Sequence, residues 1–484
     1  MKSPIATVAA DETRLTVFSL TRRSILASAA SALALGLRAQ VNRGAAGRPN
    51  IVYIMADDLG YADLSCYGRR EYKTQNIDSI GAMGARFLQA YANSAVCSAT
   101  RTALITGRYQ YRLRVGLEEP IRSANTEIGL PPEHPTLPSL LRKAGYGTTL
   151  VGKWHLGRLP KYGPLKSGYD HFWGFRGSAL DYYTHKYDIA SSDTEDLWDD
   201  DAKIHQTGYL TDLLGDRAVR TIGDYAKAGQ EFFLSLHFNA PHWPWEAPGD
   251  EAESRRIKEL VDRDGGSQKT YARMVMEMDL QVGRVLKALE TSKIAGNTLV
   301  VFTSDNGGER FADTWPFTGK KMELLEGGLR IPALIRWPGH IRPATVTNQV
   351  AITMDWVPTL LAAAGVGPDP AYPPDGINLL PMVTQNGASV ARKLFWRYHY
   401  YAQRAMRDGD MKYLRINGNE FLFNVADDPL ERANLKDRQA EVFQRMAKEY
   451  EAWNATMLPD RNDVYSSPLG YADELADHFG VRRQ

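Results

Sequence analysis

Four short, mostly apolar runs, separated by segments of helical pattern, constrain the fold of this 484-residue chain most strongly. They cover residues 51–56, 147–151, 232–238 and 298–303. Continuous apolar runs of strand length are typical of strands buried on both faces, as in a parallel sheet. We therefore expect these runs to be strands of one central sheet.

The segments between the runs have the apolar periodicity of helices. The clearest example steps by four, four, three and four residues through Met274, Met278, Val282, Val285 and Leu289. Such a stripe lies on one face of a helix, and we interpret it as part of the core. Alternation of strand and helix predicts an α/β fold, with a central, mostly parallel sheet flanked by helices.

The pattern changes near Leu394. Short alternating segments at 405–416 and 420–424 contain or flank Asp-Gly and Asn-Gly pairs, which are typical of β-hairpins. A helical segment follows near residues 440–453. We therefore expect a small antiparallel sheet, followed by one helix, at the C-terminal end of the chain.

The first 47 residues have the pattern of an export signal and a linker. Residues 21–26 contain the pair Arg22-Arg23 and resemble a twin-arginine signal, and the uncharged run 24–37 is too short to span a bilayer. An amphipathic surface helix is the alternative. We expect export to the periplasm by the twin-arginine translocation machinery, with no membrane span in the mature protein. The expected division is a signal and linker at 1–47, a large α/β domain at 48–393 and a C-terminal subdomain at 394–484.

The composition and the net charge are those of an ordinary globular protein. Hydrophobic residues make up 43% of the chain and charged residues 24%. The formal net charge is only +1, and no basic stripe is present. We therefore expect no nucleic-acid partner.

Side chains with oxygen donors come directly after the first and the last apolar run. They are Asp57-Asp58 and Asp305-Asn306. The carboxyl ends of the strands form the usual ligand side of such a sheet. Adjacent acids also occur at helix N-caps, but two such pairs together offer hard oxygen ligands that suit Ca²⁺, with Mg²⁺ as the alternative.

The segment from Cys97 to Arg108 is the most specific motif of the chain. It reads Cys97-Ser-Ala-Thr-Arg101 and ends in Thr106-Gly-Arg108. This segment resembles the signature of the type I sulfatases, a family of the alkaline-phosphatase-like superfamily. The resemblance implies that a formylglycine-generating enzyme oxidises Cys97 to formylglycine, whose hydrated aldehyde becomes the nucleophile. Ala99 stands where most members have proline, a variant that also occurs in the family.

The position of Cys97 suits an anionic substrate. At the start of a helix, free backbone N–H groups and the positive end of the helix dipole face the ligand. Arg101, four residues on, lies on the same helical face and can hold the nucleophile or a neighbouring carboxylate. A disulfide with Cys66 would consume the nucleophile, so we interpret Cys66 as structural and unpaired.

Three further segments match the family in the same order along the chain. They are Gly152-Lys-Trp-His-Leu-Gly157, Ala240-Pro-His-Trp-Pro244 and Gly319-Lys-Lys-Met-Glu-Leu-Leu-Glu-Gly-Gly-Leu-Arg330. The resemblance implies that Lys153 and Lys321 bind sulfate oxygens. It also implies that His155 deprotonates the spare hydroxyl of the nucleophile, and that His242 protonates the departing alcohol.

Two of these assignments have alternatives close by in the sequence. Lys321 stands five residues before Glu326, which is the family's spacing, and Lys320 is the alternative. His237 is the less favoured alternative to His242. The resemblance finally implies a divalent ion, usually calcium, bound by Asp57, Asp58, Asp305, Asn306 and an oxygen of the formylglycine at Cys97.

The implied function is hydrolysis of sulfate monoesters, on an aryl group or on a carbohydrate. The first alternative is a phosphomonoester or phosphodiester hydrolase of the same superfamily. The second is a non-catalytic anion-binding protein in which Cys97 is unmodified. Segments 181–186 and 396–401 are rich in rings and hydrogen-bond donors, as sugar-binding rims are. Such clusters are as often plain packing, so the sequence does not choose between the two substrate types.

Overall fold

The computed structural model describes residues 47–191, 193–261, 265–384 and 387–468. The export signal expected at 1–47 lies outside this part of the chain, apart from Gly47. All the elements described below belong to one compact unit, Arg48–Gln484. In the described part of the chain, no helix is both long enough and apolar enough to cross a membrane.

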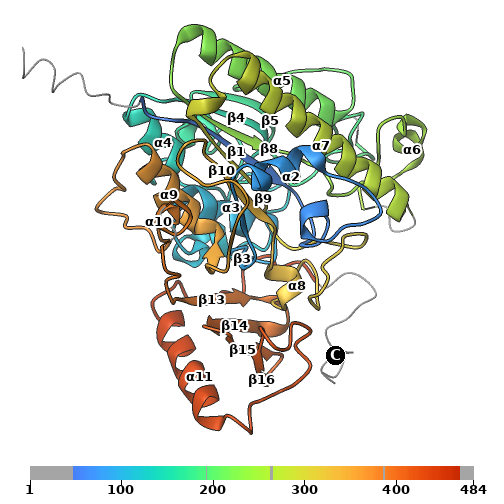
Figure 1. Ribbon diagram of the computed structural model, residues 1–484. Helices are drawn as coiled ribbons and strands as arrows, with labels where there is room; N and C mark the ends of the chain where they lie inside the picture. The colour runs from blue at the N-terminus through green and yellow to red at the C-terminus, as the bar shows by residue number, and fades with distance from the viewer. Residues whose placement is uncertain (1–46, 192, 262–264, 385–386, 469–484) are drawn as a thin grey trace, which may run out of the picture. The chain divides into compact units, whose positions relative to one another are not determined.

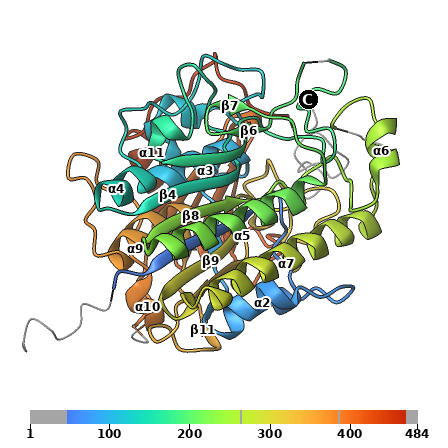
Figure 2. The same cartoon turned by 90° about the horizontal axis from the view of Figure 1, so that it is seen from above.

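A ten-stranded sheet forms the centre of the large domain (Figure 1, Figure 2). In sheet order its strands are β11 (Thr345–Thr347), β2 (Ala85–Phe87), β10 (Ala333–Arg336), β9 (Thr298–Ser304), β1 (Asn50–Ala56), β8 (Phe232–His237), β4 (Gly147–Lys153), β5 (His171–Phe175), β6 (Trp198–Asp199) and β7 (Ala202–Lys203). The middle strands β9, β1, β8, β4 and β5 are parallel, whereas β10, β6 and β7 are antiparallel to their neighbours. The expected mostly parallel sheet is confirmed.

The four apolar runs of the sequence form β1, β4, β8 and β9 in the middle of this sheet. Every residue of these strands is buried, as strands covered on both faces must be. In the register of the sheet, Met55 of β1 lies opposite His237 of β8, and Ala56 lies opposite Ser304 of β9. The residues that follow these strands therefore meet at one edge.

Helices cover both faces of the sheet (Figure 2). One layer contains α2 (Gln75–Ala82), α5 (Leu210–Ala228) and α7 (Gln268–Thr291), and the other contains α3 (Cys97–Thr106), α4 (Leu137–Lys143), α9 (Trp356–Ala363) and α10 (Leu380–Thr384). Along β1, Val52 and Ile54 pack into the first layer and Ile51 and Tyr53 into the second. The apolar stripe at 274–289 lies in α7 and is buried, so its interpretation as core is confirmed.

The C-terminal subdomain is a four-stranded antiparallel sheet, as the alternating segments predict. Its strands are β13 (Lys393–Tyr398), β14 (Gln403–Asp408), β15 (Met411–Ile416) and β16 (Asn419–Asn424), and α11 (Ala440–Asn454) packs on them. The connections of the large domain add α6 (Glu251–Arg256), α8 (Glu326–Leu329) and the paired strands β3 (Ala90–Tyr91) and β12 (Ala351–Ile352). Asn417 and Gly418 have the left-handed φ angles, 47° and 80°, that a tight turn between β15 and β16 requires.

A buried ion network joins this sheet to the large domain. Lys412 of β15 places Nζ 3.0 Å from Glu326 Oε1 and 2.8 Å from Glu431 Oε1. Glu326 also accepts hydrogen bonds from Arg330 Nε and from the hydroxyl of Tyr91, both at 2.6 Å. Burial opposes ionisation of Glu326, but the charges of Lys412 and Arg330 outweigh it and hold the pKa of that carboxyl well below its usual range.

Lys412→Met should lower the free energy of unfolding by about 3–5 kcal/mol, because two buried carboxylates then lose their shared cation. Urea titration followed by tryptophan fluorescence measures the change. The control is Lys393→Met, because Lys393 forms a half-exposed ion pair with Glu449 at 2.7 Å, and its loss should cost less than about 1 kcal/mol. Equal effects of the two substitutions would contradict this prediction.

Candidate active site

The edge of the sheet where β1, β4, β8 and β9 end also holds the first turn of α3. Asp57 and Asp305 directly follow β1 and β9, and Lys153 is the last residue of β4. Cys97 is the first residue of α3, because Val96 before it is extended. The ten residues predicted as ligands or catalytic groups are all buried, with no more than 5% of any of them exposed. The fold thus gathers residues that lie far apart in the sequence.

Three carboxylates and one amide form the acidic part of the site. The backbone N–H of Asp58 donates to Asp305 Oδ1 at 3.2 Å, and Asn306 Nδ2 donates to Asp58 Oδ1 at 2.6 Å. Cys97 Sγ lies 3.5 Å from Asp57 Oδ1. Asn306 Oδ1 has no hydrogen-bond partner among the described residues.

This donor set fits a hard divalent cation, which takes carboxylate and amide oxygens as ligands. Four ligand atoms, one each from Asp57, Asp58, Cys97 and His242, lie within 4.8 Å of one another. The buried amide oxygen of Asn306 that lacks a partner supplies a further donor beside them. His242 is the member of this group that the sequence did not propose as a ligand.

Each carboxylate of the site is paired with a buried cation. The pairs are Lys153 Nζ with Asp57 Oδ2 at 2.5 Å, Lys321 Nζ with Asp58 Oδ2 at 2.6 Å, and Arg101 Nη2 with Asp305 Oδ2 at 2.9 Å. Of the two contacts expected for Arg101, the structure therefore has the one to a neighbouring carboxylate. Burial opposes ionisation of Asp58, but Lys321 and His242 together lower its pKa to about 2. Burial and the charge of Asp57 raise the pKa of Asp305 to about 6.

The two histidines of the motifs are buried near the charges of this cluster. His155 Nε2 lies 2.7 Å from the carbonyl oxygen of Ile121, and Nδ1 has no partner among the described residues. His242 Nδ1 lies 2.7 Å from the carbonyl oxygen of Trp243, and Nε2 lies 3.2 Å from Lys321 Nζ. Burial, followed by the charge of a neighbouring lysine, lowers the pKa of each imidazole well below its usual value. Both rings are therefore neutral near pH 7, and each has one nitrogen directed away from its backbone partner.

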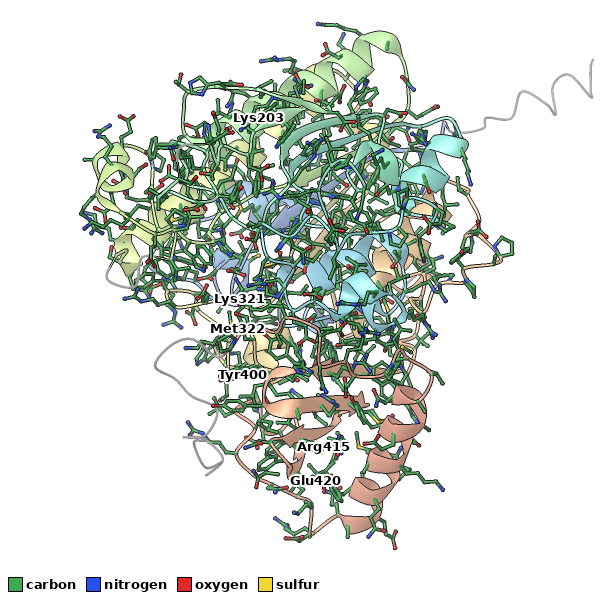
Figure 3. All side chains as sticks on the ribbon, turned by 180° about the vertical axis from the view of Figure 1, so that it is seen from behind. Lys203, Lys321, Met322, Tyr400, Arg415 and Glu420 are labelled. Carbon is green, nitrogen blue, oxygen red and sulfur yellow. The ribbon has the colours of Figure 1, made fainter. Side chains whose placement is uncertain are left out.

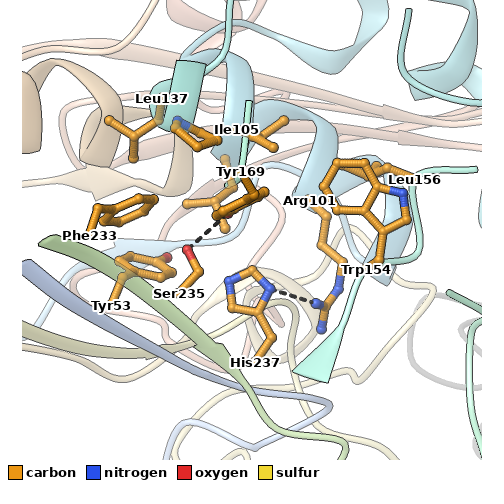
Figure 4. Close-up of a pocket in the computed structure, with 12 residues that line it drawn as sticks. Tyr53, Arg101, Ile105, Leu137, Trp154, Leu156, Tyr169, Phe233, Ser235 and His237 are labelled. Atoms are coloured by element: carbon orange, nitrogen blue, oxygen red, sulfur yellow. Dashed lines mark hydrogen bonds between the residues drawn. The ribbon is translucent and has the colours of Figure 1, made fainter. Parts of the chain in front are cut away.

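His237 lies behind the site instead of in it. Its Nδ1 is 3.4 Å from Arg101 Nη1 and 3.1 Å from the carbonyl oxygen of Lys153. With Arg101, Tyr53 and Trp154 it lines a small cavity of about 20 Å³ (Figure 4). The ring therefore contacts Arg101 from the side of this cavity.

A larger pocket of about 350 Å³ opens in front of the charge cluster. It is lined by the predicted residues Cys97, His155, His242 and Lys321, and also by Pro120, Ile121, Arg122, Ser123, Ser178, Trp243, Val261, Glu309, Met322, Tyr465, Ser467 and Pro468. Lys321 reaches it, whereas Lys320 is absent from its lining. This geometry places the nucleophile candidate, both histidines and one lysine around a single pocket.

The sequence did not single out the outer wall of this pocket. Glu309 lies three residues after Asn306, so the motif that contains Asn306 could have suggested it. Tyr465 and Ser467, in contrast, come from the C-terminal segment. That segment runs beside the loop at Glu119, whose backbone exchanges hydrogen bonds of 2.8 and 2.6 Å with it. No local pattern marks such a contact.

The two aromatic segments considered as sugar-binding rims do not line the pocket. Tyr182 is fully buried and donates to the carbonyl oxygen of His242 at 2.9 Å. Trp396 is also fully buried, and its Nε1 donates to the carbonyl oxygen of Ala92 at 2.8 Å. In both segments the buried rings pack the fold around the site.

Similarity to known proteins agrees with this geometry. Residues 49–366 match the sulfatase family, and residues 315–455 match the C-terminal region of N-sulphoglucosamine sulphohydrolase. N-acetylgalactosamine-6-sulfatase of Homo sapiens is 34% identical over 369 residues, which cover 73% of this chain and 69% of that protein. Arylsulfatase A of Homo sapiens is 32% identical over 406 residues, which cover 78% of this chain and 74% of that protein.

Solved structures share the same fold. Ps i-CgsB in complex with k-i-k-neocarrahexaose has a TM-score of 0.79 at 29% identity, over 87% of this chain and 95% of that chain. The PsFucS1 sulfatase from Pseudoalteromonas sp. has a TM-score of 0.70 at 26% identity, over 92% of this chain and 96% of that chain. Because the family match spans most of the large domain and includes the buried charge cluster, the chain belongs to the sulfatase family and is a sulfuric ester hydrolase.

Proposed function

We propose that this sulfatase hydrolyses sulfate esters of saccharides, using a formylglycine made from Cys97 and a bound Ca²⁺. The observation that carries the proposal is the position of Cys97, at the first turn of α3 and at the wall of the 350 Å³ pocket. Buried lysines and carboxylates surround it. A sulfate group entering this pocket meets the positive end of a helix and Lys321, which lines the pocket.

The state of the unmodified thiol supports the modification. Burial raises the pKa of the Cys97 thiol well above its usual value. The residue is therefore protonated at neutral pH, and a protonated thiol is a poor nucleophile. A hydrated formylglycine supplies two hydroxyl groups on one carbon, one to accept the sulfuryl group and one to release sulfate.

The surrounding side chains bind the sulfate group, transfer protons and orient the acidic part of the site. Lys153 and Lys321 bind the sulfate oxygens and stabilise negative charge that develops during transfer. His155, whose Nδ1 is without a partner, takes the proton of the spare hydroxyl. His242 delivers a proton to the departing alcohol from Nε2, and because the ring is neutral that proton comes from Lys321 Nζ, 3.2 Å away. Arg101 holds Asp305 in place and so orients the acidic part of the site.

We assign the divalent ion to Asp57, Asp58, Asp305, Asn306 and the modified side chain at position 97. Ca²⁺ is favoured because the donors are all hard oxygens and Ca²⁺ tolerates irregular coordination better than Mg²⁺ does. When bound, such an ion draws negative charge away from a sulfate oxygen. Mg²⁺ stays the alternative.

The wall of the pocket favours a sugar as the leaving group. Arg122, Ser123, Ser178 and Glu309 offer hydrogen bonds, and Glu309 Oε2 has no hydrogen-bond partner among the described residues. The ring of Trp243 adds an apolar face. The similarity to N-acetylgalactosamine-6-sulfatase, and to a structure that holds a neocarrahexaose, supports the same choice.

Phosphate esters are disfavoured by charge. Lys321 Nζ lies 2.6 Å from Asp58 Oδ2 and 3.9 Å from Glu309 Oε2, so its charge is already shared between two carboxyl groups. A sulfate monoester carries one negative charge, whereas a phosphate monoester carries two. The second negative charge of a phosphate monoester would be repelled by these carboxyl groups. Like charges in contact cost several kcal/mol.

We further propose that residues 1–47 are a twin-arginine signal and that the enzyme works in the periplasm. Twin-arginine translocation exports folded proteins, so a formylglycine-generating enzyme can modify Cys97 before export. Residues 48–393 are then the catalytic domain and 394–484 its C-terminal subdomain.

A substrate panel tests the proposed function. Initial rates should be compared for sulfated mono- and oligosaccharides, 4-nitrophenyl sulfate and 4-nitrophenyl phosphate. We expect kcat/KM to be highest for a saccharide sulfate and at least about 100-fold lower for the phosphate than for the matched aryl sulfate. A phosphate rate equal to that of the aryl sulfate would favour the phosphohydrolase alternative. No turnover of any ester, with an unmodified thiol at Cys97 by peptide mass, would favour the anion-binding protein.

Substitution of Cys97 separates the two hydroxyl functions. Cys97→Ala should abolish turnover. Cys97→Ser keeps one hydroxyl, so it should accept a sulfuryl group once and remain sulfated, because no second hydroxyl expels the group. Intact mass after incubation with substrate, about 80 Da heavier for the added SO₃, measures this trapped state. Sustained turnover by Cys97→Ser at a rate near that of the wild type would refute the role of the second hydroxyl.

Chelation tests the metal. EDTA should abolish activity, and Ca²⁺ should restore it at least as well as Mg²⁺. Asp305→Ala should lose bound metal and activity together, measured by elemental analysis and initial rate, because a ligand and a neutralising charge disappear at once. Asp313→Ala is the control, since Asp313 is a half-buried acid outside the cluster. Full metal content in Asp305→Ala would remove this residue from the ligand set.

A further inference from the structure

The segment that carries Lys321 is held by the C-terminal subdomain. Lys321 and Met322 lie where the large domain meets that subdomain, near Tyr400 (Figure 3). In the sequence, Lys321 belongs to the loop between β9 and α8, and every predicted catalytic residue comes from the large domain. The contacts below show how a residue of the other sheet reaches this loop.

Gln403, the first residue of β14, makes two hydrogen bonds to the loop through its side-chain amide. Oε1 accepts from the backbone N–H of Leu324 at 2.9 Å, and Nε2 donates to the carbonyl oxygen of Met322 at 3.0 Å. A carbonyl and an N–H two residues apart are the groups that a parallel neighbouring strand binds. The amide of Gln403, which is fully buried, thus takes the place of a peptide group in such a strand.

Backbone hydrogen bonds also tie this loop to other segments of the site. Met322 has a φ of 72°, a left-handed conformation that residues with a side chain seldom adopt. Its N–H donates to the carbonyl oxygen of Ala95, and the N–H of Lys321 donates to that of Gly308, both at 2.9 Å. Ala95 and Gly308 each stand two residues from a site residue, so these two bonds connect the loop to the nucleophile and ligand segments. Gln403 adds two bonds from the C-terminal subdomain to the same loop.

The far end of the same loop is also bound by the C-terminal part of the chain. The backbone N–H of Glu326, where α8 begins, donates to Glu431 Oε2 at 2.7 Å. Lys412 lies between these two carboxylates. The loop from Met322 to Glu326 is therefore bound at both ends by residues that follow position 400.

We propose that Gln403 is a positioning residue of the active site, which sets the place of Lys321 through the backbone of Met322. The proposal rests on the proposed role of Lys321 in binding sulfate. A displacement of Met322 moves the Cα of Lys321, and Nζ then leaves its place 2.6 Å from Asp58 Oδ2. Misplacement of a catalytic group by about 1 Å can cost on the order of 100-fold in rate.

The test compares two buried glutamines that bind backbone in the same way. Gln403→Met removes both hydrogen bonds while keeping the volume of the side chain. Gln349→Met is the matched control, because Gln349 is also fully buried and binds Val390 through its backbone N–H at 2.7 Å and its carbonyl oxygen at 3.2 Å. Val390 belongs to a segment without any residue of the site.

Gln403→Met should lower kcat/KM for a sulfate ester by about 10- to 100-fold and weaken inhibition by inorganic sulfate by about 5-fold or more. Gln349→Met should keep both constants within about twofold of wild type, with a comparable shift of the thermal unfolding midpoint. If Gln403→Met does not fold, Gln403→Glu serves instead. It keeps the bond from the N–H of Leu324 but replaces the donor to Met322 by a carboxylate oxygen that repels its carbonyl oxygen, so a loss of kcat/KM at least as large is expected.

A double substitution shows whether the effect passes through Lys321. In the Lys321→Ala background, Gln403→Met should lower kcat/KM by less than about twofold, because the group that it positions is absent. Full additivity, equal losses in the two glutamine variants, or wild-type kcat/KM in Gln403→Met would each overturn the proposal. An unaltered kcat/KM in Lys321→Ala alone would instead refute the proposed role of Lys321, a distinct result.

Discussion

Balanced burial of opposite charges at the carboxyl edge of the sheet is the constraint on which the rest of this structure depends. Asp57, Asp58 and Asp305 are buried, and each faces a buried cation at 2.5–2.9 Å. A single buried charge without a partner would cost several kcal/mol. Each carboxylate therefore needs its cation beside it in the folded protein. The fold brings the two members of each pair together from separate parts of the chain. The same balance leaves a pocket beside the charges and a group of donor atoms close enough together to hold a metal ion.

The parallel register of the central strands places most of these charged residues at the same edge of the sheet. β1 pairs with β9 up to Ala56 and Ser304, so the residues that follow, Asp57 and Asp305, emerge side by side. β4 ends at Lys153, one strand beyond β8. A shift of register would move Asp57 away from Asp305 and leave buried charges without their partners. Fold stability and site geometry thus depend on the same pairing.

The C-terminal subdomain takes part in the site as well as in the fold. Lys412 is buried between Glu326 and Glu431, and Gln403 binds the loop that carries Lys321. Tyr465 adds to the wall of the pocket. The large domain contains the motifs, but the position of one lysine and the outer wall of the pocket depend on residues that follow position 400.

The sequence by itself determined the central strands and the family, because these rest on local patterns. The apolar runs at 51–56 and 298–303 indicate buried strands whichever other segments pack on them, and the order of motifs around Cys97 identifies the sulfatase family. Only the tertiary structure decided that Arg101 pairs with Asp305 and that the ring of Trp396 packs inside the fold. The binding of the lysine loop by Gln403 was likewise decided there. Contacts of this kind join residues many positions apart, and they depend on how buried polar groups find partners once the core has packed. No short-range pattern in the sequence specifies that choice.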